Sequence, residues 1–290
     1  GAGGECITFI RNIENLDYYD AVQFLAEKVG LKMPIEQEDD GLYVLRKRIY
    51  EANREAARFF YNNLVKPDCP AYEYLIKRGI KPNTIKRFGL GYAPDSWDAL
   101  TRHLRSLGFH DNELISAYLS KKSRTGSTID VFMNRLMFPI IDLRGNVVAF
   151  GGRVLGDEKP KYINTSDTPV FKKGRGIFAL NLAKAHGRSL ILCEGYMDVI
   201  AMHQAGFETA IAGLGTAFTT EQAQLVARYA DEVTLAYDSD EAGRNAAKRT
   251  LSIFQSCNVK TKVLNLTGGK DPDEIIKRFG KEYMQKIIDG

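Results

Sequence analysis

Six carboxylates in the last hundred residues form three pairs whose spacing suits a cation site. The pairs follow three apolar segments and consist of Glu194 with Asp198, Asp238 with Asp240, and Asp271 with Asp273. The first pair is one helical turn apart and the others are two residues apart, so both members of a pair can face the same side. Crowded carboxylates repel each other unless a countercharge is present. Oxygen ligands of this kind suit Mg²⁺ or Mn²⁺, which bind carboxylates together with substrate phosphates.

A different interpretation places these acids at the N-termini of helices. Asp240, Glu241 and Asp273 each precede or open a segment with helical periodicity, where an acidic side chain caps backbone N–H groups. For any single pair this is the more ordinary explanation. Three pairs that follow strands of one sheet favour a shared crevice instead, because ligands of open α/β sheets bind beyond the carboxyl ends of the strands.

The elements that must position these carboxylates alternate from residue 189 onwards. Apolar segments such as SLILCEG, ETAIAGLG and EVTLAYDSD are separated by amphipathic segments of helical length. This alternation predicts a parallel sheet with helices on both faces, and hence an α/β fold. Upstream, residues 135–155 have the pattern of a β-hairpin. The first hundred residues are expected to be mainly helical, with helices over 17–30, 45–64, within 71–94 and over 97–108, and a linker from Pro34 through the acidic run 36–40.

The charge of the chain is unevenly distributed. Residues 121–185 carry 12 basic and 5 acidic side chains, whereas residues 191–290 carry 11 and 14. A basic block beside an acidic one suggests a polyanion-binding surface next to the carboxylate site. The four cysteines form no CxxC pair, which argues against a zinc site or a disulfide framework and favours a reducing cytoplasm. No run of about 18 apolar residues is present, so we expect a soluble protein without a membrane partner.

Two groups of motifs in this sequence resemble a known family. Glu194-Gly195-x-x-Asp198, followed about forty residues later by Asp238-x-Asp240-x-x-Gly243, resembles the Toprim domain of primases, topoisomerases and certain nucleases. The upstream segments YLIKRGI, FGLGYAP, NRLMFPIID, GGRVLGDEKPKYINT and FKKGR together resemble the bacterial DnaG-type DNA primase. The resemblance covers nearly the whole chain.

The resemblance implies a division into three parts. Residues 1–64 are expected to hold the tail of a zinc-binding domain, a helix and a helical linker. Residues 65–185 form the basic mixed α/β subdomain, and 186–290 the Toprim domain with its parallel sheet. Zinc is then expected only in the full-length protein, and Cys6 is not a zinc ligand. The C-terminal domain through which the family contacts the replicative helicase is expected to be missing.

The same resemblance implies a function. The chain is expected to be a DNA-directed RNA polymerase of the cytoplasmic replication fork, which makes short RNA primers on single-stranded DNA from NTPs. Glu194, Asp238 and Asp240 would be catalytic, with Mg²⁺ or Mn²⁺ bound among the six carboxylates. Glu194 would be either a metal ligand or a proton acceptor. A Toprim nuclease or topoisomerase fragment, and a non-catalytic nucleic-acid scaffold, remain as alternatives.

The basic block then acquires a binding role by resemblance. Nucleic acid or nucleotide would be held by Arg135, Arg153, Lys161 and Lys173, with Tyr162 and Asn164 beside them. Tyr162 could stack on a base. Gly151 and Gly152 directly precede Arg153, which suggests a close approach of the backbone to a ligand.

Overall fold

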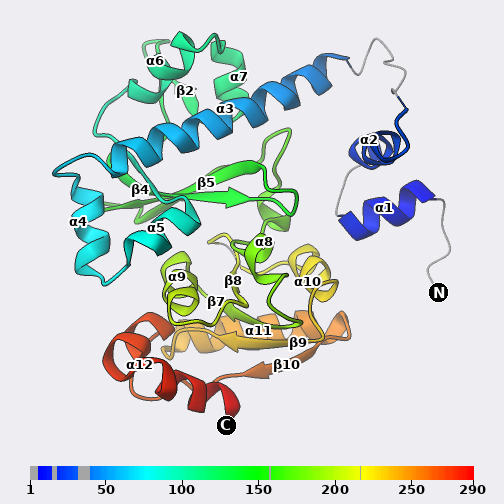
Figure 1. Cartoon of the computed structure of the whole chain (residues 1–290), viewed down its shortest axis with the longest axis vertical. Helices are drawn as coiled ribbons and strands as arrows, with labels where there is room; N and C mark the ends of the chain where they lie inside the picture. Colours follow the sequence, from blue (N-terminus) through cyan, green and yellow to red (C-terminus); the bar gives the residue numbers. More distant parts are fainter. Residues whose placement is uncertain (1–5, 15–17, 32–39, 157, 216) are drawn as a thin grey trace. The chain divides into compact units, whose positions relative to one another are not determined.

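The computed structural model describes the chain except for residues 1–5, 15–17, 32–39, 157 and 216 (Figure 1). Two units are present, Gly1–Leu45 and Arg46–Gly290. The first unit contains the helices α1 (Cys6–Glu14) and α2 (Tyr18–Lys28) and the start of α3 (Asp40–Leu64). The helix predicted over 17–30 is therefore confirmed. The predicted linker falls almost entirely outside the described residues.

The second unit begins with helices and an antiparallel sheet. Its helical part comprises the rest of α3, α4 (Pro70–Lys77), α5 (Pro82–Phe88), α6 (Ala99–Ser106) and α7 (Asp111–Ser116). Proline at the first turn opens both α4 and α5, where its missing N–H costs no helical hydrogen bond. The predicted pair of short helices and the predicted helix near 97–108 are confirmed. In the described residues, no helix is long and apolar enough to span a membrane.

The predicted hairpin forms the centre of the antiparallel sheet, whose strand order is β1-β4-β5-β6. The strands are β1 (Gly91–Ala93), β4 (Arg135–Ile141), β5 (Val147–Val154) and β6 (Tyr162–Asn164). A separate small hairpin pairs β2 (Ser120–Lys122) with β3 (Thr128–Asp130). The strands β1, β2, β3 and β6 and the helix α7 were not predicted.

The parallel sheet confirms the predicted α/β architecture, with strand order β10-β9-β7-β8. Its strands are β7 (Ser189–Cys193), β8 (Ala210–Ala212), β9 (Glu232–Ala236) and β10 (Lys260–Val263), and its helices are α9 (Tyr196–Gln204), α10 (Thr220–Ala227), α11 (Glu241–Ser256) and α12 (Pro272–Asp289). Successive side chains of β7 enter two different apolar clusters. Ile191 and Cys193 pack with α9, whereas Leu190 and Leu192 pack with α10 and α11. Both faces are therefore covered, as an apolar parallel sheet requires.

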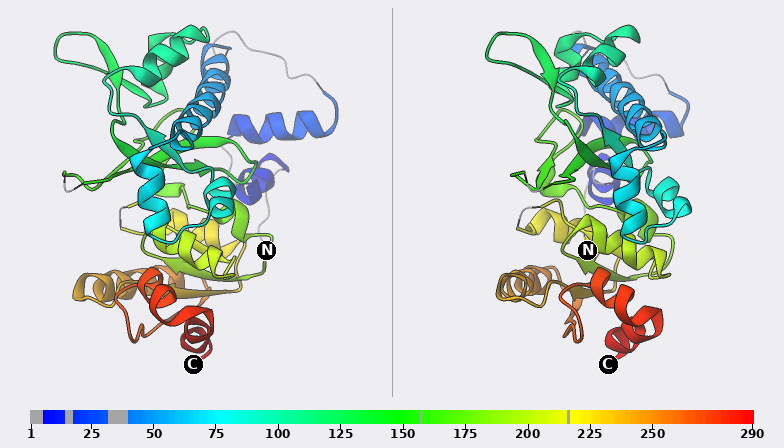
Figure 2. Two further views of the ribbon diagram at one scale, coloured as in Figure 1. Left: turned by 60° about the vertical axis from the view of Figure 1, so that its left-hand side comes forward. Right: turned by 90° about the vertical axis from the view of Figure 1, so that its left-hand side faces the viewer.

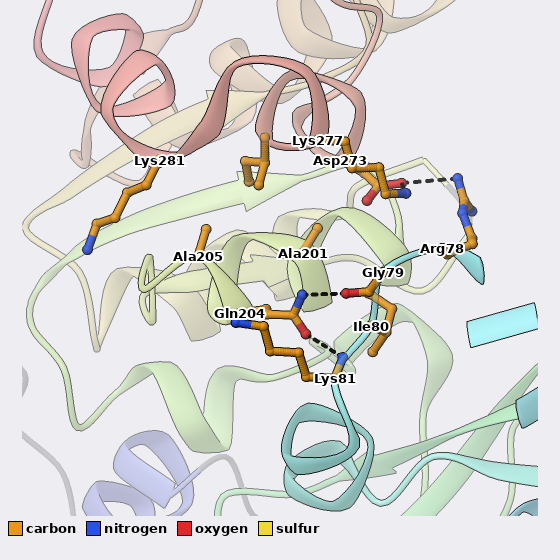
Figure 3. Close-up of a pocket in the computed structure, with 11 residues that line it drawn as sticks. Arg78, Gly79, Ile80, Lys81, Ala201, Gln204, Ala205, Asp273, Lys277 and Lys281 are labelled. Carbon is orange, nitrogen blue, oxygen red and sulfur yellow. Dashed lines mark hydrogen bonds and ion pairs between the residues drawn. The ribbon is translucent and has the colours of Figure 1, made fainter. Parts of the chain in front are cut away.

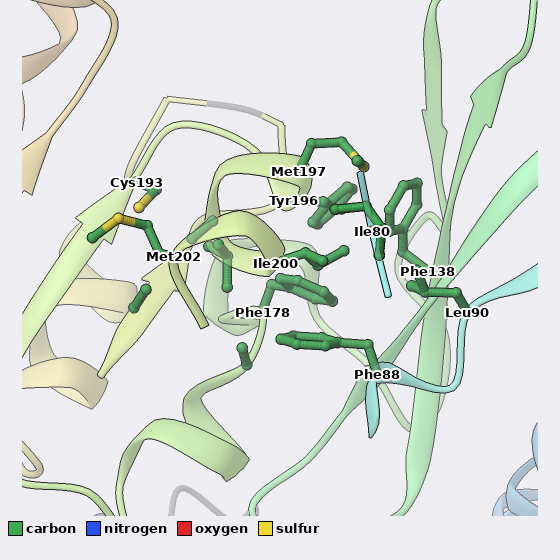
Figure 4. Close-up of a cluster of buried hydrophobic side chains, with 14 of the residues drawn as sticks. Ile80, Phe88, Leu90, Phe138, Phe178, Cys193, Tyr196, Met197, Ile200 and Met202 are labelled. Carbon is green, nitrogen blue, oxygen red and sulfur yellow. The ribbon is translucent and has the colours of Figure 1, made fainter. Parts of the chain in front are cut away.

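One apolar core connects the two sheets (Figure 4). Tyr196, at the start of α9, stacks on Phe138 of β4 with ring centroids 5.0 Å apart and contacts Phe178 at 4.8 Å. Phe88 of α5 stacks on the other side of this group, 5.8 Å from Phe178. In Figure 1 and both views of Figure 2, the antiparallel sheet lies above the parallel sheet. The shared core fixes the basic strands relative to the strand ends that carry the carboxylates.

His203 of α9 lies in this core and gives a pH-dependent stability. It is 3% exposed, its Nε2 lies 2.8 Å from the carbonyl oxygen of Ala210, and burial lowers its pKa to about 4. This contribution to the free energy of unfolding is fully present above the unfolded pKa and is lost as the pH falls through about 4. Between pH 6.5 and 4 we expect a loss of roughly 3 kcal/mol at most. Urea unfolding at several pH values measures it, and His203→Asn should flatten the slope; an equal slope in both proteins would contradict the assignment.

Candidate active site

Glu194 and Asp238 meet at the carboxyl edge of the parallel sheet. Their strands β7 and β9 are neighbours, with Cys193 opposite Ala236. The backbone N–H of Asp238 donates to Oε2 of Glu194 at 3.3 Å. Partial desolvation and the charge of Asp238 raise the pKa of Glu194, and desolvation likewise raises the pKa of Asp238. Raised pKa values of neighbouring carboxylates are common at functional sites, where a cation can relieve their repulsion.

Asp198 extends this group from the first turn of α9. Its carboxylate accepts a hydrogen bond from the backbone N–H of Asp273. Burial, followed by the charges of Asp271 and Asp238, raises the pKa of Asp198 to about 8. Burial and the neighbouring carboxylates therefore favour the neutral form of Asp198.

The helix-cap interpretation is confirmed for Asp240, and Glu241 and Asp273 lie in the first turns of α11 and α12; Asp271, which was not named for this role, is also a cap. Oδ1 of Asp240 accepts the N–H of Gly243 at 2.9 Å and caps α11. Oδ1 of Asp271 accepts the N–H of Glu274 at 2.7 Å and caps α12. A cap occupies one carboxylate oxygen, so the second oxygen stays available to a cation. The two interpretations are therefore compatible for these residues.

Asp273 has a different environment from the other carboxylates (Figure 3). Its Oδ2 accepts from Arg78 at 3.0 Å and from Lys277, and the side chain is only 4% exposed. Asp273 and Arg78 line a cavity of about 250 Å³ between the α4–α5 connection, α9 and α12. There Gln204 donates to the carbonyl of Gly79 and accepts from the N–H of Lys81. These contacts join the helical part of the chain to the parallel sheet, and they leave Asp273 tied to protein cations.

The ammonium of Lys270 supplies the countercharge for Asp238 and Asp240. Its Nζ lies 3.4 Å from Oδ2 of Asp238 and 3.6 Å from Oδ2 of Asp240. The sequence analysis missed Lys270, although the requirement for a countercharge and its place in GKDPDE were visible. In the described part of the chain, no three His, Cys, Asp or Glu side chains are grouped closely enough to hold a metal ion. Two carboxylates that converge on one ammonium still fit Mg²⁺ or Mn²⁺ shared with substrate phosphates, because such ions often take only one or two protein carboxylates.

Arg135 begins β4 and contacts the backbone of the β5–β6 region, and its role in binding nucleic acid stays a prediction. The residue is 7% exposed, and its Nη1 donates to the carbonyl oxygens of Gly152 and Pro160, each at 3.2 Å. Burial lowers its pKa. The guanidinium thus supports the turn after β5.

Gly151 and Gly152, which precede Arg153, leave room for side chains of the protein interior. A Cβ at Gly152 would lie 2.9 Å from the ring of Phe132 and 3.1 Å from Cδ of Arg135. A Cβ at Gly151 would lie 2.6 Å from the ring of Tyr196. The predicted close approach is real, but the approaching groups are protein side chains.

Arg153 itself lies beside a second arginine that the sequence analysis missed. The guanidinium carbons of Arg153 and Arg78 lie 4.7 and 5.7 Å from the centre of the Tyr74 ring. Nη1 of Arg153 donates to the carbonyl of Val154 at 2.8 Å, and its buried Nε has no hydrogen-bond partner in the described residues. Arg78 was visible only as one of several basic residues in YLIKRGI, and its contact with Asp273 crosses 195 positions of the sequence.

Tyr162 and Asn164 of β6 are engaged within the protein. The Tyr162 ring packs against Tyr196 at 5.9 Å and Phe138 at 6.3 Å, and burial raises its pKa to about 12. Asn164 donates to the carbonyl of Leu214 at 2.9 Å and accepts from the Tyr196 hydroxyl at 2.8 Å. Both side chains therefore help to hold the two sheets together. Stacking of a base on Tyr162 would have to use the part of the ring that this packing leaves exposed.

Lys161 and Lys173 keep the character expected of phosphate-binding residues. Lys161 is exposed, and Lys173, in the short 3₁₀ helix Lys173–Arg175, is half-buried. The backbone N–H of Lys173 donates to Asp167. In the part of the chain that the structure describes, neither ammonium forms an ion pair with a carboxylate.

Known proteins resemble this chain along most of its length. The family described as DNA primase catalytic core, N-terminal domain, matches residues 59–184, and the family described as Toprim-like matches residues 191–276. The DNA primase of Clostridium acetobutylicum is 40% identical over 295 residues, which cover 100% of this chain and 49% of that protein. This chain thus spans about half the length of the curated relatives that it matches.

Two solved structures resemble the fold. The RNA polymerase domain of Mycobacterium tuberculosis primase DnaG shares 36% identity at a TM-score of 0.78, covering 84% of this chain and 83% of that chain. A DnaG primase catalytic domain bound to ssDNA shares 35% identity at a TM-score of 0.78, covering 85% of this chain and 82% of that chain.

A parallel sheet of the Toprim type with carboxylates at its strand ends, joined to a basic antiparallel sheet, defines the catalytic core of a primase. The particular family follows from the identity and from the coverage of whole polymerase domains. The chain belongs to the DnaG primase family. The resemblance drawn from YLIKRGI, NRLMFPIID and the Toprim motifs is confirmed.

Proposed function

We propose that this chain is the polymerase part of a DNA primase and joins NTPs into a short RNA primer on a single-stranded DNA template. The observation that carries this proposal is the convergence of Asp238 and Asp240 on the ammonium of Lys270, beside Glu194. The primase relatives support it, and one of them is bound to ssDNA. We retain the division into residues 1–64, 65–185 and 186–290 as part of the proposal.

The reaction is a nucleotidyl transfer. The primer 3′-hydroxyl attacks the α-phosphorus of the incoming NTP, a P–O bond forms, and the bond to the β,γ-diphosphate breaks to release pyrophosphate. Mg²⁺ or Mn²⁺, when bound, would neutralise the triphosphate and stabilise the developing charge. Asp238 and Asp240 would hold the ion, and Glu194 would either complete its ligands or accept the proton of the 3′-hydroxyl. The raised pKa of Glu194 suits a proton acceptor, whereas its place beside Asp238 suits a ligand.

The proposed partners follow from this reaction. They are the single-stranded template, the RNA primer and NTPs, at the cytoplasmic replication fork. Contact with the replicative helicase and the binding of zinc belong, in our proposal, to parts of the longer relatives that this chain does not match. The chain spans only about half of those relatives.

A single assay separates this function from the two alternatives. The chain is incubated with labelled NTPs, Mn²⁺ and single-stranded DNA, and the products are separated by size. New RNA that depends on the template supports a primase, shortened DNA indicates a Toprim nuclease, and bound but unchanged DNA indicates a non-catalytic scaffold.

Template binding is expected to depend on salt through the two accessible lysines. Replacing Lys161 or Lys173 by Ala should reduce the slope of log affinity against log salt by about 0.7, because each phosphate contact releases counterions from a single strand. Arg135→Ala should instead lower the melting temperature, since its guanidinium donates to the carbonyl groups of Gly152 and Pro160, the first of which is buried. Fluorescence anisotropy with a labelled oligonucleotide at several salt concentrations measures the slope. Lys262→Ala, which removes a lysine paired with Glu232, is the control, and an unchanged slope in both Lys161 and Lys173 variants would exclude the proposed surface.

A further inference from the structure

The backbone of Lys270 is tied to both sides of the carboxylate site. The N–H of Ser239, which lies between the two aspartates, donates to the carbonyl oxygen of Lys270 at 2.9 Å. The N–H of Lys270 donates to Oε2 of Glu274 in the first turn of α12 at 2.8 Å. These bonds fix the Cα of Lys270 between the loop after β9 and the start of α12. The position of this lysine is therefore set by the fold and does not depend on its ammonium.

The side chain, in contrast, is held only loosely. It is 57% exposed, and its Nζ is 3.4 and 3.6 Å from the nearest oxygens of Asp238 and Asp240, longer than a close charged hydrogen bond. A lysine carries its charge on a flexible stem of four carbons with several accessible rotamers. The ammonium can therefore leave the pair without any change of the backbone.

The ammonium and a divalent cation require the same two oxygens. Oδ1 of Asp240 is used by the cap of α11, so the oxygen left for a cation is the Oδ2 that faces Lys270. Asp238 likewise presents Oδ2 to the ammonium. A divalent ion bound there would repel an ammonium at this distance. Occupation by one cation thus excludes the other.

We propose that Lys270 is a positioning residue that competes with the divalent cation for Asp238 and Asp240. Its ammonium holds the two carboxylates together while no metal is bound and moves away when the metal binds. This inference deepens the proposed function and rests on it, because it assumes a metal site at these aspartates. A displaced ammonium gains a new partner in the triphosphate that accompanies the metal. Lys270 thereby weakens the binding of metal alone and makes metal and nucleotide binding cooperative.

The test is a Mn²⁺ titration of the whole chain without nucleotide, followed by electron paramagnetic resonance of the free ion. Lys270→Met keeps the length of the side chain but removes its charge, and we expect about tenfold tighter Mn²⁺ binding. Lys270→Arg keeps the charge and should bind Mn²⁺ as the wild type does. Lys260→Met is the matched control, because it removes a lysine that is paired with Glu232 at the start of β10. Adding a non-hydrolysable NTP analogue should tighten Mn²⁺ binding more in the wild type than in Lys270→Met.

The outcomes distinguish this inference from the proposed function. If Asp238→Asn abolishes Mn²⁺ binding but Lys270→Met binds like the wild type, the competition is refuted and the metal site stands. Equal tightening in Lys270→Met and Lys260→Met would reduce the effect to net charge and would also refute it. If Mn²⁺ binds neither the wild type nor Lys270→Met, or if Asp238→Asn binds it unchanged, the metal site itself fails, and the inference fails with it.

Discussion

Asp238→Asn is expected to reduce RNA primer synthesis at least about a hundredfold while the chain remains folded. The substitution removes one of the two carboxylates that converge on the Lys270 ammonium and leaves the size of the side chain unchanged. It also removes the negative charge that helps to raise the pKa of Glu194. Because this repulsion disappears, and because the ion pair with Lys270 is 3.4 Å long with an ammonium side chain that is 57% exposed, we expect a melting temperature equal to or slightly above that of the wild type.

Primer synthesis from labelled NTPs and thermal unfolding measure the two parts of this expectation. Glu194→Gln should behave in the same way, since it removes the neighbouring carboxylate. Asp231→Asn is the matched control: this aspartate lies just before β9 in an exposed pair with Arg188, far from the carboxyl edge of the sheet. Near-normal synthesis by Asp238→Asn would refute the proposed mechanism, and a large fall in melting temperature would show that Asp238 is a structural residue.

Gly243→Ala is expected to damage both the fold and the activity. Gly243 lies in the first turn of α11, and a Cβ there would overlap the carbonyl oxygen of Asp238 and lie 2.8 Å from its carbonyl carbon. The obstacle is backbone, which cannot rotate away as a side chain can. We expect a loss of about 1–3 kcal/mol in the free energy of unfolding. Displacement of Asp238 should also reduce primer synthesis at least tenfold, since misplacing a reacting group by about 1 Å can cost 100-fold.

The control for this variant is Gly41→Ala in the first turn of α3. Among the described residues, nothing lies within 4 Å of a Cβ at Gly41, so the substitution should leave the activity unchanged and stabilise the helix by at most about 1 kcal/mol. Urea unfolding and the primer assay distinguish the two glycines. A Gly243→Ala protein with normal stability and activity would show that the turn between β9 and α11 can relax around the added methyl group.

The sequence was most informative where its pattern was long. The alternation of buried strands and helices after residue 189 predicts the parallel sheet, because each strand must bury side chains on both faces. The sites of the carboxylates follow from the ends of those strands. The strands β1, β2, β3 and β6 have three residues each, which is too short for a period to be recognised.

The residues that the sequence placed less well show what it lacks. A basic or small residue can be recognised from its type, but its direction depends on partners that are distant in the sequence. Arg135 of β4 donates to the carbonyl oxygen of Gly152 in β5, and a Cβ at Gly152 would lie 3.1 Å from Cδ of Arg135, so this glycine is explained by a contact within the protein. Lys270 and Arg78 were missed for the opposite reason, since their importance appears only when aspartates from other segments are placed beside them.

The stacking of Tyr196 on Phe138 also bears on how a polymerase of the proposed kind would select its substrate. Tyr196 begins the helix that carries Asp198, and the same aromatic group reaches the strands that lead to Arg153 and Asn164. Closing one half of the molecule over an incoming nucleotide would have to pull these rings apart and expose a large apolar surface to water. Under the proposed function, a correct nucleotide would therefore be distinguished without a rotation of one sheet against the other.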